Sequence, residues 1–231
     1  MISVILPTYN EKGNVKELVW RTVKALKRDF EIVVVDDDSL DGTGDEVRRL
    51  QRRVKNLRLV MRKGEKGLPG AIKKGVEMAK GEVVAWMDAD LSMPPEKLPE
   101  MAAKLKKYDV VVGSYFVKGG KDMRGEKHGK WFSWLVNFLA RRVLGGGITD
   151  YTSGFIVAKK KAVWGARFEG AHGSYFVDVV YRAIRRGFRV TEEAYVLLPR
   201  GYGESKVKGV WPYLNAGLAY LAAIVRARFG E

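Results

Sequence analysis

The 231-residue sequence contains no cysteine and only two histidines. Disulfide bonds and thiolate metal sites are therefore excluded, which suits a reducing compartment. No apolar run reaches the ~20 residues that a membrane-spanning helix needs. The first residues run directly into a strand pattern, so we expect no signal peptide and a cytoplasmic location. Internal repeats and low-complexity segments are also absent.

Acidic residues are outnumbered, because 42 Lys and Arg against 27 Asp and Glu give a net charge of +15. This excess predicts an anionic partner, which is nucleic acid, an acidic membrane surface or a phosphorylated substrate. The basic residues are spread along the chain and no recognised nucleic-acid-binding module occurs, so we do not expect nucleic acid. A hydrophobic content of 46% is enough for one sizeable core.

Short apolar runs alternate with helix-period stretches through the first half of the chain. Strands are predicted at 3–6, 31–35, 57–61, 83–87 and 109–113. Asn14, with Glu17 three residues later, is typical of a helix N-cap. The alternation predicts an α/β fold with a mostly parallel sheet covered by helices.

Two long apolar stretches mark the second half, at 131–144 and 211–229. Both carry aromatic residues and end on arginines, and the first is interrupted by a polar stripe. These features predict amphipathic helices that lie on an anionic membrane surface without crossing it. The alternative is that both are ordinary core helices of the domain.

Acidic residues follow several of the predicted strands, where an open α/β sheet binds its ligands. Asp88-Ala-Asp90 comes directly after an apolar run, and Asp36-Asp-Asp38 follows another. Carboxylates at such a place are costly without a positive partner. Hard cations such as Mg²⁺ or Mn²⁺ bridge carboxylates to a substrate diphosphate, so Asp-Ala-Asp predicts a metal–diphosphate site. The alternatives are a solvated turn before Pro94 and, for the triplet, an Asx turn that caps the next helix.

These motifs resemble those of the family 2 glycosyltransferases, which have the GT-A fold. The resemblance covers the whole chain and is strongest to the dolichol-phosphate mannose synthases. The residues that carry it are Pro7-Thr-Tyr-Asn-Glu11, Val35-Asp-Asp-Asp-Ser39 with Asp41-Gly-Thr43, Lys66-Gly-Leu68 with Ala71 and Gly75, Met87–Pro95, Gly113-Ser with Val117-Lys-Gly-Gly120, Asp150 with Ser153-Gly-Phe155, and Gly203-Glu-Ser-Lys206.

The resemblance implies a nucleotide-sugar donor, with GDP-mannose favoured, held by residues 1–115, and an acceptor-binding half at 116–231 of the same compact domain. Asp90 is implied as the first ligand of Mg²⁺ or Mn²⁺, Asp88 as a contact to the sugar or the metal, and Ser92 as a weaker metal ligand. The implied donor-binding residues are Pro7, Tyr9, Glu11, Asp36, Asp37, Lys66, Gly67, Asp88, Ala89 and Asp90.

The implied acceptor is a polyprenyl or dolichyl phosphate at the inner face of the membrane. This chain has Tyr115, Gly129 and Tyr202 where the synthases carry arginines that hold the acceptor phosphate. The residues that we expect to bind the acceptor instead are Lys118, Arg124, Lys130, Ser153, Arg200 and Lys206.

The implied reaction is an inverting glycosyl transfer. A lipid phosphate is already ionised near neutral pH and needs no strong base. A hydroxyl acceptor, as with a UDP-glucose-type donor, would need a carboxylate base, for which Asp178 is the candidate. Asp178 could equally be an exposed helix acid. A basic nucleic-acid- or membrane-binding protein without catalysis is the alternative of a different class.

Overall fold

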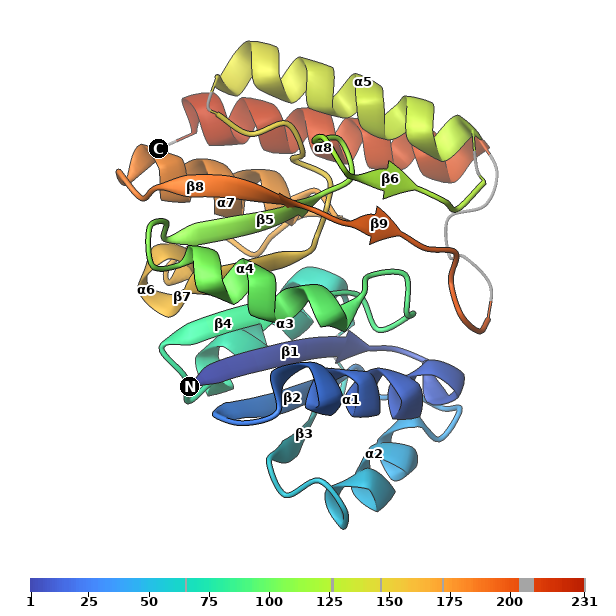
Figure 1. Ribbon diagram of the computed structural model, residues 1–231. Helices are drawn as coiled ribbons and strands as arrows, with labels where there is room; N and C mark the ends of the chain where they lie inside the picture. The colour runs from blue at the N-terminus through green and yellow to red at the C-terminus, as the bar shows by residue number, and fades with distance from the viewer. Residues whose placement is uncertain (65, 126, 146, 172, 204–209, 231) are drawn as a thin grey trace.

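A seven-stranded sheet in the order β3-β2-β1-β4-β7-β5-β8 forms the centre of the computed structural model (Figure 1). The structure describes residues 1–64, 66–125, 127–145, 147–171, 173–203 and 210–230, without the side chains of 127, 128 and 210–214. The strands are β1 (Ile2–Thr8), β2 (Phe30–Asp36), β3 (Leu57–Met61), β4 (Val83–Trp86), β5 (Val110–Ser114), β7 (Ile156–Lys159) and β8 (Val190–Ala194).

All of these strands run parallel except β7, which pairs antiparallel with both β4 and β5. In the first half, β1 pairs with β2 from Ile2↔Phe30 to Thr8↔Asp36. The mostly parallel sheet is thus confirmed. Because β7 is reversed, its amino end lies beside the carboxyl ends of β4 and β5. The turn before β7 therefore reaches the same edge of the sheet as the acidic strand ends.

Successive side chains along the central strands enter two separate cores, because strand side chains alternate between faces. Val4 and Leu6 lie in one core, and Ile5 lies in the other. The first core is covered by α1 (Lys12–Leu26), α2 (Thr43–Gln51) and α4 (Leu98–Lys104). The short 3₁₀ helix η1 (Pro95–Lys97) packs against α1. The second is covered by α3 (Leu68–Met78), α6 (Lys160–Val163) and α7 (Tyr175–Arg185). Burial on both faces explains the unbroken apolar runs of the sequence.

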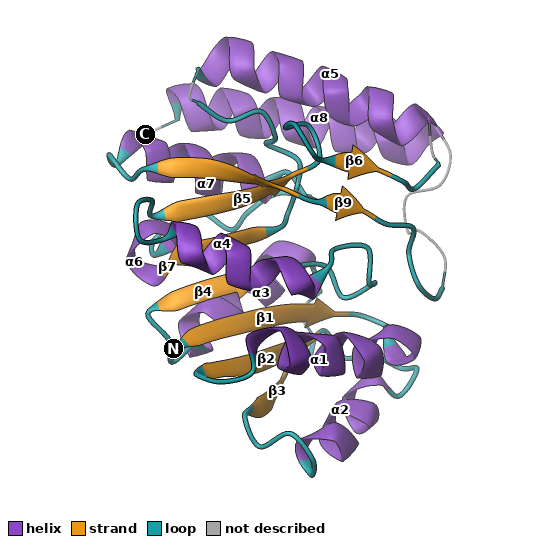
Figure 2. Cartoon of the chain, in the orientation of Figure 1, coloured by secondary structure: helices purple, strands orange, loops and turns teal. Residues whose placement is uncertain are grey.

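The second half adds a small sheet and a pair of long helices at one end of the molecule. Strands β6 (Lys121–Asp122) and β9 (Val196–Leu197) pair in parallel. Helices α5 (Lys127–Leu144) and α8 (Val210–Phe229) lie side by side (Figure 2). Val136 and Ala140 of α5, with Ala223 and Ile224 of α8, join the second core. One face of each helix therefore packs in the core, which agrees with the alternative that these two stretches are core helices of the domain.

The prediction that Asn14 caps α1 is wrong. The helix begins at Lys12, Glu11 is the N-cap residue, and Glu11 makes no side-chain capping bond. Asn14 is instead 1% exposed. Its side-chain amide is bonded to Glu11 and to the main chain of Tyr202, 188 positions further along the chain. A tertiary partner has replaced the local capping bond that the sequence pattern suggested.

Gly75 of α3 lies directly on Ile5 of β1, and a Cβ added there would be 2.3 Å from Ile5 Cγ2. We expect Gly75→Ala to lower the free energy of unfolding by about 1–3 kcal/mol, because the methyl group would push the helix off the sheet. Gly147→Ala is the control, since no atom lies within 4 Å of its added Cβ. Urea unfolding followed by tryptophan fluorescence measures both variants, and equal midpoints would contradict the prediction.

Candidate functional site

A cleft of about 870 Å³ opens at the carboxyl edge of the sheet. Its walls come from residues that follow β1, β2, β4, β5 and β8, and from the turn that precedes β7. The predicted site residues that line it are Pro7, Tyr9, Glu11, Asp37, Lys66, Gly67, Asp88, Ala89, Asp90, Ser92, Arg124, Ser153 and Arg200. The strand-end acids are thus brought together with basic residues from the second half.

The two neighbouring acids after β2 have different surroundings. Asp36 is fully buried and accepts hydrogen bonds from Thr8 Oγ1 (2.8 Å) and from Ser39 N (2.9 Å) and Oγ (2.7 Å). It does not line the cleft, and its contacts are those of a turn. Asp37 does line the cleft, where Gly67 N (2.7 Å) and Arg62 Nη1 (2.8 Å) donate to it. Burial raises the pKa of Asp37 despite these donors.

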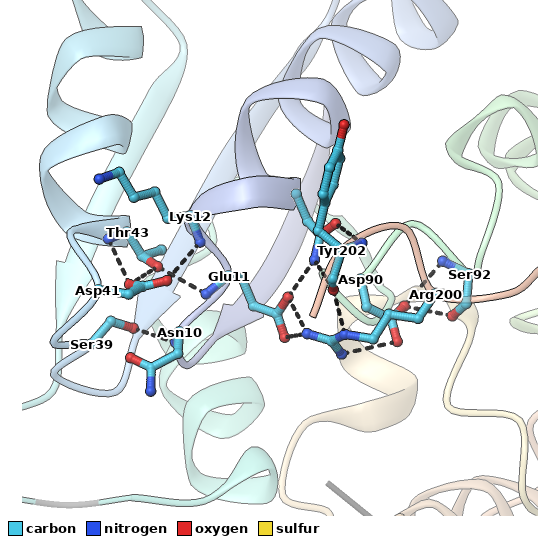
Figure 3. Close-up of polar contacts among 11 residues, drawn as sticks. Asn10, Glu11, Lys12, Ser39, Asp41, Thr43, Asp90, Ser92, Arg200 and Tyr202 are labelled. Atoms are coloured by element: carbon cyan, nitrogen blue, oxygen red, sulfur yellow. Dashed lines mark hydrogen bonds and ion pairs between the residues drawn. The ribbon is translucent and has the colours of Figure 1, made fainter. Parts of the chain in front are cut away.

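An ion cluster joins the start of the chain to the loop after β9 (Figure 3). Arg200 donates through Nη2 to both carboxylate oxygens of Glu11, and its Nη1 lies 3.4 Å from Asp90 Oδ2. Glu11 is 6% exposed. Gly201 N donates to the main-chain oxygen of Asp90 (2.9 Å), so the loop is tied to the cleft by its main chain as well.

Asp90 is oriented by the residue two positions after it. Ser92 donates to Asp90 Oδ1 through its main-chain N (3.0 Å) and its Oγ (2.6 Å). Leu91, between them, has a φ of 67°, a left-handed conformation that turns the chain sharply after β4. The Ser92 hydroxyl is therefore a positioning donor for Asp90.

Lys66 and Tyr9 form the side of the cleft beyond Asp37. Lys66 Nζ donates to the Tyr9 hydroxyl (3.1 Å) and lies 4.8 Å from the centre of the Tyr9 ring. Gly67 lines the cleft, but its N–H is bonded to Asp37 and its carbonyl accepts from Arg62 Nη1 (3.1 Å). The amide of Gly67, a donor-binding residue by the resemblance, is thus held by a carboxylate in this structure.

The acceptor candidates divide into those in the cleft and those away from it. Arg124 and Ser153 line the cleft. Lys130 is exposed and lines a smaller cavity of about 540 Å³ with Trp131 and Trp134. Lys118 is exposed in a turn after β5. Lys206 lies outside the described residues.

Asp178, the candidate base, is 1% exposed on α7 and is not among the residues that line the cleft. Its Oδ2 accepts from Arg182 Nε (2.8 Å) and Arg167 N (3.3 Å). The structure does not bring this carboxylate to the other acids.

Several cleft residues were not predicted from the sequence. Tyr175, Tyr195 and Tyr220 show no local motif, although Tyr195 follows a strand whose carboxyl end lies at the same edge. Arg62, which donates to Asp37 without lining the cleft itself, was not predicted either. Arg62 falls in a stretch that shows only basic and Gly-rich composition. Their place depends on strand pairing that is not local in the sequence.

Residues 3–166 match the sequence model of glycosyl transferase family 2. The chain is a family 2 glycosyltransferase. This match confirms the resemblance and the expectation of an enzyme.

Three relatives share at least 32% identity with this glycosyltransferase. The dolichol-phosphate mannosyltransferase of Pyrococcus furiosus is 35% identical over 93% of this chain and 62% of its own length. The undecaprenyl-phosphate mannosyltransferase of Micrococcus luteus is 32% identical over 99% of both chains. The Saccharomyces cerevisiae dolichol-phosphate mannosyltransferase is 34% identical over 69% of this chain and 61% of its own. The glycosyltransferase thus spans about three-fifths of the first and third relatives.

Solved structures confirm the GT-A fold. Glucosyl-3-phosphoglycerate synthase from Mycobacterium tuberculosis in complex with Mn²⁺, UDP and phosphoglyceric acid gives a TM-score of 0.74 at 15% identity, over 99% of this chain and 78% of that one. The complex of the same synthase with Mg²⁺ and UDP gives 0.71 at 16% identity, over 99% and 79%.

Behind the cleft wall of the glycosyltransferase, Asp150 is fully buried. Its Oδ1 accepts from Thr152 N and Oγ1 (both 2.9 Å), while Oδ2 has no hydrogen-bond partner among the described residues. Burial, helped by the nearby Glu192 carboxylate and opposed by the Thr152 bonds, raises the pKa of Asp150 to about 7. The folded protein therefore favours the neutral acid below about pH 7.

We expect Asp150 to make the protein less stable as the pH rises from about 4 to about 7. The pKa is higher in the folded than in the unfolded state, so the stability that Asp150 contributes is complete below pH 4 and is lost through pH 7. The free energy of unfolding of Asp150→Asn, relative to that of the wild type, should rise by up to about 4 kcal/mol between pH 4 and pH 7. Above pH 7 the difference should stay constant. Unfolding free energies at several pH values measure the difference, with Asp45→Asn on the surface as control. A pH-independent difference would disprove the assignment.

Proposed function

We propose that this glycosyltransferase transfers mannose from GDP-mannose to a polyprenyl phosphate, at the cytoplasmic surface of a membrane and with Mg²⁺ or Mn²⁺. The observation that carries the proposal is the likeness to the undecaprenyl-phosphate mannosyltransferase of M. luteus over 99% of both chains. The names of the P. furiosus and yeast relatives point to the same class of acceptor.

The β1, β2 and β4 end of the cleft suits the nucleotide. Asp37 and Glu11 line it, and carboxylates accept the hydrogen bonds that a base N–H or ribose hydroxyl donates. Tyr9 and Pro7 supply a ring and an apolar surface beside them. Lys66 provides a cation for the diphosphate at the same wall.

Asp88 and Asp90 fit a divalent cation that is shared with the substrate. Among the described residues, no group of three or more acidic or histidine side chains is placed to hold a metal ion. Mg²⁺ is commonly bound by one or two carboxylates and completes its shell with substrate phosphate and water. Asp88 and Asp90 would hold the cation, with Ser92 fixing the Asp90 carboxylate. A bound cation would neutralise the charge that develops on the departing diphosphate.

A phosphate acceptor agrees better with the cleft than a hydroxyl acceptor does. An oxygen of an ionised phosphate attacks the anomeric carbon without losing a proton, so no base is required. The hydroxyl acceptor of the UDP-glucose-type alternative needs a base, and Asp178 is paired with Arg182 away from the cleft lining. Family membership argues against a basic binding protein without catalysis.

Asp90→Asn tests the metal role. We expect this variant to lose Mn²⁺- or Mg²⁺-dependent transfer by roughly 100-fold or more, because the charge on the leaving diphosphate loses its counter-ion. Arg200 keeps its Glu11 partner in this variant, so the fold should persist. The assay follows release of GDP from GDP-mannose with a polyprenyl phosphate, and Asp45→Asn controls for the loss of a surface charge. Near wild-type turnover would remove Asp90 from the metal site.

The outer faces of α5 and α8 support membrane attachment. Trp131, Trp134 and Phe138 lie three or four residues apart on α5, and are 63%, 50% and 41% exposed. Trp134 and Phe138 stack with ring centres 5.7 Å apart. On α8, Leu218, Leu221, Val225 and Phe229 are 45–73% exposed. In the described part of the chain, no helix has the length and hydropathy to span a bilayer.

We therefore predict binding to the membrane interface through this face, helped by exposed cations such as Lys130 and Arg142. Sedimentation with anionic vesicles should bring down the wild type at low salt and less of it at high salt. The double variant Trp131→Ser with Trp134→Ser should sediment several-fold less. Trp20→Ser with Trp164→Ser removes two exposed tryptophans from other surfaces and should match the wild type. If the protein stays in the supernatant with every lipid, the prediction fails.

A further inference from the structure

The hydroxyl group of Tyr195 has no hydrogen-bond partner among the described residues, although the side chain is 1% exposed. A buried hydroxyl without a partner costs about 1–3 kcal/mol, so such groups are rare and call for an explanation. Tyr195 lines the main cleft. The missing partner can therefore be supplied by a ligand in the cleft.

Tyr195 is held rigidly where it stands. It lies between β8 and β9, its N–H donates to Ser114 O (3.2 Å), and its carbonyl accepts from Lys121 N (3.1 Å). Its ring makes edge-to-face contacts with Phe155 (5.4 Å between centres) and Tyr115 (6.2 Å). A hydroxyl fixed on both backbone and ring is a preorganised donor, since little freedom is lost when it binds.

A guanidinium belongs to the same group of side chains. Arg124 is held by Asp122 through Nε (3.2 Å) and Nη2 (2.8 Å), and its Cζ lies 5.9 Å from the Tyr115 ring centre. Ser153 also lines this part of the cleft. Its Oγ accepts from Phe155 N (3.2 Å), which leaves its hydroxyl proton available for donation.

The protonation of Tyr195 favours an anionic ligand. Burial, together with the nearby Asp150 and Tyr115, raises the pKa of Tyr195 well above its ordinary value, and Ser153 opposes the shift. The group is therefore a neutral phenol that can donate a proton in a hydrogen bond. A phenol and a hydroxyl beside a fixed guanidinium form a donor set for an oxyanion.

Tyr195 and the acids assigned to the nucleotide sugar follow different strands of the sheet. Glu11, Asp37 and Asp90 follow β1, β2 and β4, whereas Tyr195 follows β8, which is three places from β4 in the sheet. At ~4.8 Å a strand, the two strands themselves are about 14 Å apart. The acids at the first end would need a bound cation to accept an anion, whereas Arg124 supplies a positive charge at the second.

We infer that Tyr195, with Arg124 and Ser153, binds the phosphate of the acceptor, and that the Tyr195 hydroxyl is a specificity-determining donor for a phosphate monoester. This assignment rests on the proposed function and deepens it. The acceptor phosphate then approaches from the β5–β8 end, while the nucleotide sugar occupies the β1–β4 end. The two meet in the middle of one cleft.

Calorimetric titration with farnesyl phosphate and with farnesol tests the inference. Tyr195→Phe removes only the oxygen atom, so its melting temperature should equal or exceed that of the wild type. It should bind farnesyl phosphate roughly 10-fold to 100-fold more weakly, the range expected for a hydrogen bond to a charged group. Binding of farnesol and of GDP-mannose should not change. Tyr181→Phe removes the hydroxyl of a buried tyrosine outside the cleft lining and should bind like the wild type.

The outcomes separate the two hypotheses. If the wild type shows no preference for farnesyl phosphate over farnesol, the phosphate acceptor of the proposed function is wrong. If the wild type has the preference and Tyr195→Phe keeps all of it, the role of Tyr195 is wrong. A loss confined to GDP-mannose binding would assign the hydroxyl to the donor and also overturn the inference. Arg124→Gln should also weaken the binding of farnesyl phosphate, and this variant tests the same site through a second residue.

Discussion

The acidic side chains at the carboxyl edge of the sheet require positive partners, and this requirement joins the two halves of the chain. Glu11 and Asp37 are 6% and 4% exposed, so leaving either charge unpaired would cost several kcal/mol. Arg62 neutralises Asp37 from within the first half. Glu11 depends on Arg200, 189 positions away, and Arg200 also reaches Asp90. The loop after β9 is therefore part of the end of the cleft that β1, β2 and β4 form, and the first half alone does not complete this end.

Hydrophobic periodicity was sufficient to predict most elements of the fold. The predicted strand 57–61 is β3, and the predicted strand 83–87 differs from β4 by one residue. The edge at which the acids gather also followed from the sequence, because parallel strands place their carboxyl ends together. Such predictions succeed because they depend on patterns within one segment and on one rule of sheet topology.

The error at Asn14 occurred because a distant segment changed a local pattern. Asn14 has the spacing of a cap but is bonded to Glu11 and Tyr202. A remote partner also holds the amide of Gly67, which is bonded to Asp37, 30 positions earlier, and the donor-binding role of Gly67 stays a prediction. The aromatic stretches at α5 and α8 fit both predictions made for them, since each helix has a core face and an exposed face. The partners Tyr202 and Asp37 are remote in sequence from Asn14 and Gly67, so they can be identified only from the tertiary fold.

The three positions where the dolichol-phosphate mannose synthases carry arginine have different surroundings here. Tyr115 and Gly129 line the cleft, whereas Tyr202 is 61% exposed and is bonded through its main chain to Asn14. Replacing an arginine by Tyr115 removes a cation, but the Tyr115 ring packs against Arg124, which lies two residues after β6. A guanidinium that is already fixed by a carboxylate and a ring loses little freedom on binding an anion. Under the proposed assignment, phosphate recognition would depend on one preorganised cation with hydroxyl donors around it, and not on the number of arginines in the cleft.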